Sequence, residues 1–497
     1  MATTPETYAA IDLGSNSFHM IVANWIDGRI QVVDKLKDTV RLAGGLDANQ
    51  KLTDEAVAGA LECLQRFGQR IKEIPSSNVR AVGTNTLRQA RNSRSFLKKA
   101  TQALGHNIGI ISGREEARLI FLGIAYSNYH ETEQRLIIDI GGGSTELAIG
   151  QGYNARLTES LYMGCVSMSN RYFSNGEITA KKMRKAILAA RQELEAIENK
   201  YKKAGWATVY GSSGTILAIR DVLKEQGSTE IYISRTSLEQ LNNDLIEAGH
   251  IDRLKYTSLP ASRLPVFPGG VAILCAAFES LNIEQLNISD CALREGLLLD
   301  LIGRLHDRDI RDRTVSDLLP RFNIDVDHAK RVEATIKTCY KQLRSVWSLD
   351  KENDLKLLRW SALLHEVGLT IAHSQYHKHG AYLLNQSDLP GFSREEQSKL
   401  AFLVRCHRRK FSLDDLQLLP EESHEKILRL AVLLRLSVLL NRGRSSNPLP
   451  EFKLSSNNGN IEIKFPENWL AEHPLTEADL NNEAEFLNTI KTTLSFS

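Results

Sequence analysis

Cysteine is scarce in this chain and follows no pattern. The 497 residues contain six cysteines, and no two of them form a Cys-x-x-Cys motif. This spacing excludes a disulfide framework and fits the reduced thiols of a cytosolic protein. Most of the six are therefore expected to be small core residues: Cys63, Cys165, Cys275, Cys291, Cys339 and Cys406.

The chain also lacks an excess of either charge and a hydrophobic run typical of a membrane span. Lys and Arg number 62 against 60 Asp and Glu, so the formal net charge of +2 gives no reason to expect a nucleic acid partner. The most apolar late stretch, Leu428 to Leu440, contains Arg429 and Arg435 and is far shorter than the roughly 20 residues of a span. We expect a buried helix there and no integral membrane contact.

A leader sequence is not apparent either. The N-terminus, MATTPETYAAIDLGSN, lacks the basic start and apolar core of a signal peptide, so secretion is not expected. We predict a cytoplasmic protein, with peripheral association at the inner membrane left open. A chain of 497 residues is too long for one core, and its length favours roughly three or four domains.

What the chain does contain is a near-repeat. Residues 9–17, AAIDLGSNS, return as residues 137–145, IIDIGGGST, with Asp12 and Asp139 lying 127 positions apart. Each copy runs from an apolar strand into an Asp and then into small residues, which leave backbone N–H groups free to face an anion. One copy alone would be weak evidence, because strand ends often carry Asp and Gly to make a bend. Duplication at domain spacing predicts two phosphate loops on the two walls of one cleft.

These loops supply most of the predicted site. A third glycine-rich segment at the start of a predicted helix has the same character, because helix N-termini attract anions. The candidate phosphate contacts are Gly14, Ser15, Asn16, Ser17, Gly141, Gly142, Gly143, Ser144, Thr145, Gly211, Ser212, Ser213 and Gly214. Asp12, Asp139 and Glu146 are predicted to converge on one Mg²⁺, since carboxylates together with substrate phosphate oxygens commonly hold this ion. His19 is expected to pack against the sheet.

A helix start between the two loops carries a further acid. Ser112 and Glu115 have the spacing of a capping box, which gives Glu115 a structural task. Glu116 is left free in the first turn, where it is either a general base that orients water beside a phosphate or a solvated acid. The passage alone favours neither interpretation.

Basic residues and histidines give further candidates. Arg88 and Arg263 each lie beside a glycine-rich segment, and the fork of an arginine binds phosphate oxygens in pairs. A helix from Leu87 is predicted to present Arg88, Arg91 and Arg94 on one face. The basic run 405–410 is more typical of a solvated face. The passage 365–379, with His365-Glu366 and three further histidines, is either a metal site or a helix with surface histidines.

The distribution of strand and helix signals along the chain predicts four domains. Strand and helix signals of the first copy occupy residues 1–126, and the plan repeats over 127–303. Residues 304–445 contain helices with few strand signals. An alternating segment, 461–465, predicts a small β-containing tail within 446–497.

These motifs resemble the exopolyphosphatase and guanosine pentaphosphate phosphohydrolase family over nearly the whole chain. The resemblance rests on residues 10–19, 111–118, 139–146, 211–215 and 292–296. It implies an α/β fold of two ribonuclease-H-like lobes, as in actin and sugar kinases, then an all-α HD-like domain and a small α+β tail. It also implies Glu116 as catalytic base, Asp139 and Glu146 as Mg²⁺ ligands, Arg88 and Arg263 as phosphate contacts, and a homodimer.

Within that family the sequence favours the exopolyphosphatase branch. Asn85 and Gly143 stand where the pentaphosphate branch tends to have Ala. The leading hypothesis is therefore Mg²⁺-dependent, processive hydrolysis of inorganic polyphosphate, with pppGpp 5′-phosphohydrolase activity as the alternative. A kinase of the same fold and a non-enzymatic sensor are less favoured. The HD-like domain is expected to hold no metal, because Glu366 replaces the expected Asp and no Asp lies near Ser437.

Overall fold

The computed structural model describes residues 6–26, 29–128, 132–305, 309–350, 352–457 and 459–497. Residues 1–5, at the start of the N-terminal segment compared above with a signal peptide, lie outside the described residues. The chain forms two units, Met1–Asp309 and Ile310–Ser497. The predicted boundary after residue 303 falls in the last turn of helix α10 (Leu293–Leu305), which belongs to the first unit.

The first unit opens with a five-stranded sheet in the order β3-β2-β1-β4-β5. Strands β1, β2 and β3 form an antiparallel meander, and β4 and β5 extend the sheet from β1 in parallel. Successive residues of a strand point to opposite faces, and in β1 and β2 both faces are buried, each in its own apolar cluster. The strands are β1 (Glu6–Leu13), β2 (Phe18–Ile26), β3 (Arg29–Asp38), β4 (Val79–Gly83) and β5 (Ile108–Ile110).

A six-stranded sheet, β10-β11-β9-β6-β7-β8, repeats this plan in the same unit. Its meander β6-β7-β8 is antiparallel, and β9 and β11 extend it in parallel from β6. Asp12 pairs with His19 across β1 and β2, and Asp139 pairs with Glu146 at the equivalent place across β6 and β7. The strands are β6 (Gln134–Ile140), β7 (Thr145–Gln151), β8 (Asn154–Leu161), β9 (Thr208–Ser212), β10 (Tyr232–Ser234) and β11 (Gln285–Ile288).

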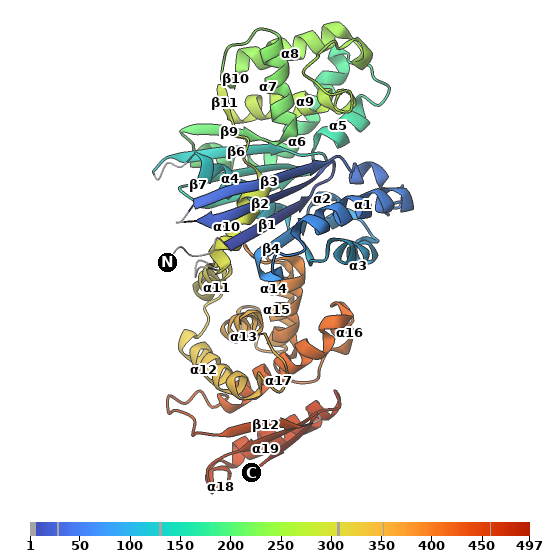
Figure 1. The fold of residues 1–497 in the computed structure, drawn as a ribbon. Coiled ribbons are helices and arrows are strands. Elements are labelled where there is room, and N and C mark those ends of the chain that lie inside the picture. The colour runs from blue at the N-terminus through green and yellow to red at the C-terminus, as the bar shows by residue number, and fades with distance from the viewer. Residues whose placement is uncertain (1–5, 27–28, 129–131, 306–308, 351, 458) are drawn as a thin grey trace. The chain divides into compact units, whose positions relative to one another are not determined.

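Helices cover both sheets and fill the space between them (Figure 1). Apolar side chains of α4 and α10 meet those of β1, β2, β6 and β7 in one buried cluster, so these two helices lie between the sheets. The helices of this unit, besides α10, are α1 (Asp54–Ile71), α2 (Asn85–Gln89), α3 (Ser93–Leu104), α4 (Gly113–Ser127), α5 (Cys165–Tyr172), α6 (Ala180–Ala204), α7 (Ser213–Glu225), α8 (Arg235–Ala248) and α9 (Phe267–Leu281).

One stretch of the described chain, Leu264–Leu281, is long and apolar enough to cross a membrane by composition. It contains α9, and 78% of the stretch is buried inside the protein. Its side chains pack in the largest apolar cluster of the second sheet. It is therefore a core helix, which passes the same test of composition.

The predicted helix from Leu87 is wrong. Helix α2 ends at Gln89 and α3 begins at Ser93. Between them the Asn92 side chain accepts from the Leu52 amide at 2.9 Å and donates to the Leu52 carbonyl at 3.0 Å. These bonds tie the chain to a neighbouring segment and interrupt the helix, so Arg88, Arg91 and Arg94 do not share one helical face.

The second unit is a helical domain followed by a three-stranded sheet, β12-β13-β14. Residues 428–440 lie in α17 and are largely buried, and the predicted strand at 461–465 is present as β13. The elements are α11 (Ile310–Arg321), α12 (Val326–Leu343), α13 (Asn353–Leu364), α14 (Tyr376–Gln386), α15 (Arg394–Cys406), α16 (Leu413–Leu416), α17 (His424–Leu440), β12 (Lys453–Asn457), β13 (Asn460–Lys464), α18 (Trp469–Glu472), α19 (Pro474–Asn488) and β14 (Thr493–Phe496).

Candidate active site

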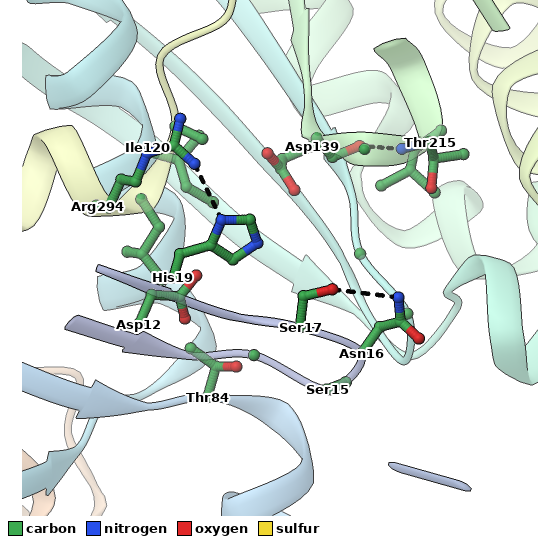
Figure 2. A pocket seen from close by; sticks show the side chains of 18 of the residues that line it. Asp12, Ser15, Asn16, Ser17, His19, Thr84, Ile120, Asp139, Thr215 and Arg294 are labelled. Carbon is green, nitrogen blue, oxygen red and sulfur yellow. Dashed lines mark hydrogen bonds between the residues drawn. The ribbon is translucent and has the colours of Figure 1, made fainter. Parts of the chain in front are cut away.

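A cleft of about 410 Å³ in the first unit brings the two copies of the repeat together (Figure 2). The loop after β1 and the loop after β6 both line it, as the duplicated motif predicts. The predicted site residues that line the cleft are Asp12, Gly14, Ser15, Asn16, Ser17, Glu116, Asp139, Gly141, Gly142, Ser144, Glu146, Ser213, Gly214 and Arg263.

Hydrogen bonds orient the two loops in the same way. The carbonyls of Gly141 and Gly142 accept from the first amides of α5, each at 2.9 Å. In the other loop, the carbonyls of Ser15 and Asn16 accept from amides of residues 43 and 41 at 2.9 and 2.8 Å. Since the C=O and N–H of a trans peptide point in opposite directions, the amides that follow these carbonyls turn away from the segments that hold the loops. Such amides are suited to phosphate oxygens.

A glycine outside the loops permits this arrangement. A Cβ on Gly164 would overlap the Gly142 carbonyl oxygen. Gly164 is the N-cap residue of α5, so the missing side chain lets this helix approach the second loop. The glycines of the motif and the glycine that precedes α5 therefore form one packed unit.

Four carboxyl groups crowd one end of the cleft. Burial and the nearby Glu116 raise the pKa of Asp12 and Glu146 well above their usual values, and they raise that of Asp139 to about 6. Among the described residues, Asp12 Oδ1 is buried and has no hydrogen-bond partner. A group of oxygen donors with unbalanced negative charge fits a hard divalent cation such as Mg²⁺.

Glu116 is neither solvated nor free. It is 8% exposed, and its Oε2 accepts from Arg88 Nη1 at 2.7 Å. The interpretation of a solvated first-turn acid is therefore wrong. Ser112 caps α4 as predicted by accepting from the Glu115 amide at 3.2 Å, while the Glu115 carboxylate binds Arg118 through two hydrogen bonds.

Five predicted site residues do not line the cleft. The Arg88 guanidinium is bound to Glu116, and Gly143 lies against the Asn85 side chain. Gly211 is a buried strand residue, because β9 continues to Ser212 with no intervening loop. The remaining two use their hydroxyls inside the protein: Thr145 donates to the Met163 carbonyl at 2.6 Å, and Ser212 donates to Asp139 Oδ2.

A positively charged wall of the cleft was missed by the sequence analysis. His19 does not simply pack against the sheet: it lines the cleft and its Nδ1 lies 3.1 Å from Arg294 Nη1, which must donate (Figure 2). Burial and the neighbouring cations lower the pKa of His19 to about 3, so its ring is neutral. Lys37, opposite His19 on β3, and Arg263 complete this wall. Lys37 and Arg294 are not among the predicted site residues.

The two residues that favoured one branch of the family contact each other. A Cβ on residue 143 would overlap the side-chain nitrogen of Asn85. Alanine at 143 therefore requires the Asn85 side chain to move or a smaller residue to replace it. Because residues 85 and 143 constrain each other, they count as one indication of the family branch and not as two.

Two lobes of the same topology, each with an Asp-led loop at a shared cleft, define a phosphate-processing protein of the actin-like class. The model of the Ppx/GppA phosphatase family matches residues 21–305, and that of Ppx/GppA phosphatase, domain III, matches residues 310–484. The chain belongs to the Ppx/GppA phosphatase family and is a phosphoanhydride hydrolase.

Similar proteins agree with the fold and correct the predicted substrate. The guanosine-5′-triphosphate,3′-diphosphate pyrophosphatase of Aeromonas hydrophila is 41% identical over 478 residues, 96% of either chain. The protein of the same name from Vibrio cholerae is 41% identical over 97% of this chain and 96% of its own. The leading expectation of an exopolyphosphatase is therefore wrong, and two of the residues that favoured it, Asn85 and Gly143, are not independent of each other.

Solved structures support the fold alone. A family member from Aquifex aeolicus has a TM-score of 0.53 at 23% identity, and an exopolyphosphatase from Cytophaga hutchinsonii has 0.55 at 22% identity. They cover 61% and 60% of this chain and 99% and 98% of their own. The predicted fold class, two actin-like lobes followed by a helical domain and a small tail with a sheet, is confirmed.

Proposed function

We propose that this protein removes the terminal 5′ phosphate of guanosine 5′-triphosphate,3′-diphosphate (pppGpp) and releases ppGpp and orthophosphate. Relatives that match across nearly the whole chain bear the name of this activity. The observation that carries the proposal is that one cleft is lined by two groups of opposite charge: the carboxyl groups of Asp12, Glu116, Asp139 and Glu146, called here the acidic half, and the cations Lys37, Arg263 and Arg294, called here the cationic half. A compact nucleotide with phosphates at both ends suits such a cleft.

The acidic half would perform the reaction. When bound by Asp12, Asp139 and Glu146, Mg²⁺ would neutralise charge on the transferred phosphoryl group. Glu116 accepts a proton from water as the water oxygen attacks the terminal phosphorus, and the bond from phosphorus to the bridging oxygen breaks. The amides of the two loops hold the oxygens of the phosphate chain.

The cationic half would bind the rest of the nucleotide. Arg263, Arg294 and Lys37 lie close enough that the two arginines lower the pKa of Lys37 together with its partial desolvation. Cations that repel one another are relieved by an anionic ligand. We assign this half to the second phosphate group of the substrate.

Orthophosphate release from pppGpp, GTP and long-chain polyphosphate, measured in parallel at matched terminal phosphate, tests the function. We expect a much higher specificity constant for pppGpp than for GTP, because GTP leaves the cationic half unfilled. Arg294→Gln should reduce this preference for pppGpp. Equal constants for pppGpp and GTP, or a higher one for polyphosphate, would contradict the proposal.

Other expectations remain predictions. The Mg²⁺ requirement, the homodimer and the cytoplasmic location are parts of the proposal that rest on the site chemistry and on the resemblance. Light scattering of the full chain would measure the oligomeric state.

A further inference from the structure

Four histidines of the second unit gather in a buried cluster. The ring centroid of His365 lies 5.5 Å from that of His328 and 5.3 Å from that of His407. The ring centroids of His377 and His407 lie 6.4 Å apart. The four side chains are 1 to 5% exposed. They come from the start of α12, the end of α13, the start of α14 and the end of α15, so the helical fold itself assembles the cluster.

Three side chains of this region have the arrangement of metal ligands. One ligand atom each of His328, His365 and Glu366 lies within 4.8 Å of the others. Atoms bound to one metal ion at about 2.1 Å lie about 3.4 Å apart in tetrahedral geometry, so small side-chain rotations close the site. All three residues are buried, which distinguishes them from the common clusters of exposed acids.

The histidines offer lone pairs that nothing else in the described chain uses. His365 Nδ1 lies 2.7 Å from the Ala362 carbonyl oxygen and must donate to it, so Nε2 keeps its lone pair. Among the described residues, His365 Nε2 and His328 Nδ1 are buried without a hydrogen-bond partner. Burial lowers the pKa of both rings, that of His365 to about 4, so both are neutral at physiological pH. Buried polar atoms without partners are rare and call for a ligand.

The surroundings suit an open coordination position. His328, His365 and Glu366 line a cavity of about 530 Å³ within the second unit. Five arginines line the same cavity: Arg408, Arg409, Arg435, Arg442 and Arg444. Arg444 forms an ion pair with Glu366 and a 2.9 Å ion pair with Asp325. A metal ion at this place would therefore compete with Arg444 for the Glu366 carboxylate and would face water or an anion on its open side.

We propose that His328, His365 and Glu366 bind a divalent transition-metal ion of borderline softness, such as Zn²⁺. Two imidazoles and one carboxylate form a ligand set that catalytic zinc sites use and that Mg²⁺ does not prefer. This site replaces the expectation of a metal-free helical domain. In this proposal Glu366 supplies the carboxylate in place of the Asp expected at this position.

Zn²⁺ titration of the metal-stripped full chain tests the site, with a chelating indicator as competitor and excess Mg²⁺ to occupy the acidic half of the active-site cleft. We expect one bound Zn²⁺ per chain and a loss of affinity of about 100-fold in His365→Gln. Co²⁺ in place of Zn²⁺ should give a visible absorption band that the same variant loses. His473→Gln, an exposed histidine of the same unit, and Asp139→Asn, in the cleft of the first unit, should leave the affinity unchanged.

Arg444→Gln provides a second test that does not alter a ligand or the core. Its side chain is 44% exposed, and its removal frees the Glu366 carboxylate. We expect this variant to bind Zn²⁺ about tenfold more tightly. Unchanged affinity in Arg444→Gln would overturn the proposal even if His365→Gln fails to fold. Absence of stoichiometric binding, or binding that Asp139→Asn abolishes, would overturn it as well.

Discussion

Arg88 holds the carboxylate of Glu116 in place. Its Nη1 donates to Glu116 Oε2 over 2.7 Å and to the Ile111 carbonyl oxygen over 3.1 Å. The arginine comes from α2 and the acid from the first turn of α4, and both side chains are largely buried. Because the Ile111 carbonyl also holds this Nη1, the guanidinium fixes the orientation of the carboxylate. This contact makes Arg88 a positioning residue in our proposal, in place of the phosphate contact implied by the resemblance.

A double-mutant cycle on this pair tests the roles of both residues. We expect Glu116→Gln to lower kcat for pppGpp by about 10²- to 10⁴-fold with little change in KM, because the amide cannot accept the proton from water. Arg88→Gln should lower kcat by a smaller factor, and the double variant should be no slower than Glu116→Gln alone. The measurement is steady-state orthophosphate release.

The matched control is another ion pair at the start of the same helix. Arg114 binds Glu159 at 2.9 Å, and neither residue lines the cleft. Glu159→Gln should leave kcat unchanged. If Arg88 contacts phosphate directly, Arg88→Gln will instead raise KM, and the two substitutions will be additive.

Crowding of carboxyl groups predicts the effect of metal removal. Chelation should abolish orthophosphate release, and added Mg²⁺ should restore it, because Asp12, Asp139 and Glu146 are buried beside Glu116 and a bound cation relieves the repulsion among these carboxylates. Asp139→Asn should raise the Mg²⁺ concentration for half-maximal activity by at least about tenfold. Asp221→Asn, outside the cleft, serves as the control. Full activity in the presence of the chelator would contradict the assignment of a cation to this group.

The sequence predicted the parts of the site that are local in the chain. Asp12 and Asp139 end buried strands, and small residues follow within a few positions, so alternation and turn chemistry suffice to locate the loops. Contacts between distant segments were not accessible in this way. Arg88 meets Glu116 across 28 residues, and Arg294 meets His19 across 275 residues. Only the paired sheets and the helices between them bring these side chains together.

The same limit contributed to the wrong substrate prediction. Asn85 and Gly143 are far apart in the sequence and were counted as separate indications of the branch. In the structure, however, a Cβ at position 143 would overlap the Asn85 side chain. We predict that Gly143→Ala lowers the melting temperature and kcat, because its Cβ pushes Asn85 or the second loop aside. Asn85→Ala combined with Gly143→Ala should restore most of both losses.

Two controls make this prediction specific. A Cβ on Gly59, in α1, meets open space, so Gly59→Ala should leave activity unchanged and stabilise the fold by up to about 1 kcal/mol. Asn85→Ala alone should be tolerated. Loss of activity in the double variant equal to that of Gly143→Ala would show that the pair is not coupled.

Asp300 gives a prediction for stability at low pH. Its carboxylate binds Arg80, Arg118 and Arg304, and all four side chains are largely buried. Burial alone would raise the pKa of Asp300, but the three guanidinium groups hold it well below the usual value of 3.8. A pKa depressed by folding contributes stability that is fully present above the usual value and is lost as the pH falls toward the depressed one.

Asp300→Asn should therefore act in two ways. At neutral pH it leaves buried arginines without this counter-charge and should lower the free energy of unfolding by about 3–5 kcal/mol. Below about pH 4 the difference from the unsubstituted protein should shrink, because Asp300 in its unfolded chain then takes up a proton while Asp300 in the folded protein stays ionised. Urea unfolding at a series of pH values measures both effects. Glu62→Gln, which breaks an exposed pair with Arg66, should change stability by about 1 kcal/mol or less at every pH. A difference for Asp300→Asn that stays constant down to about pH 2 would show that the depressed pKa is not the source of its effect.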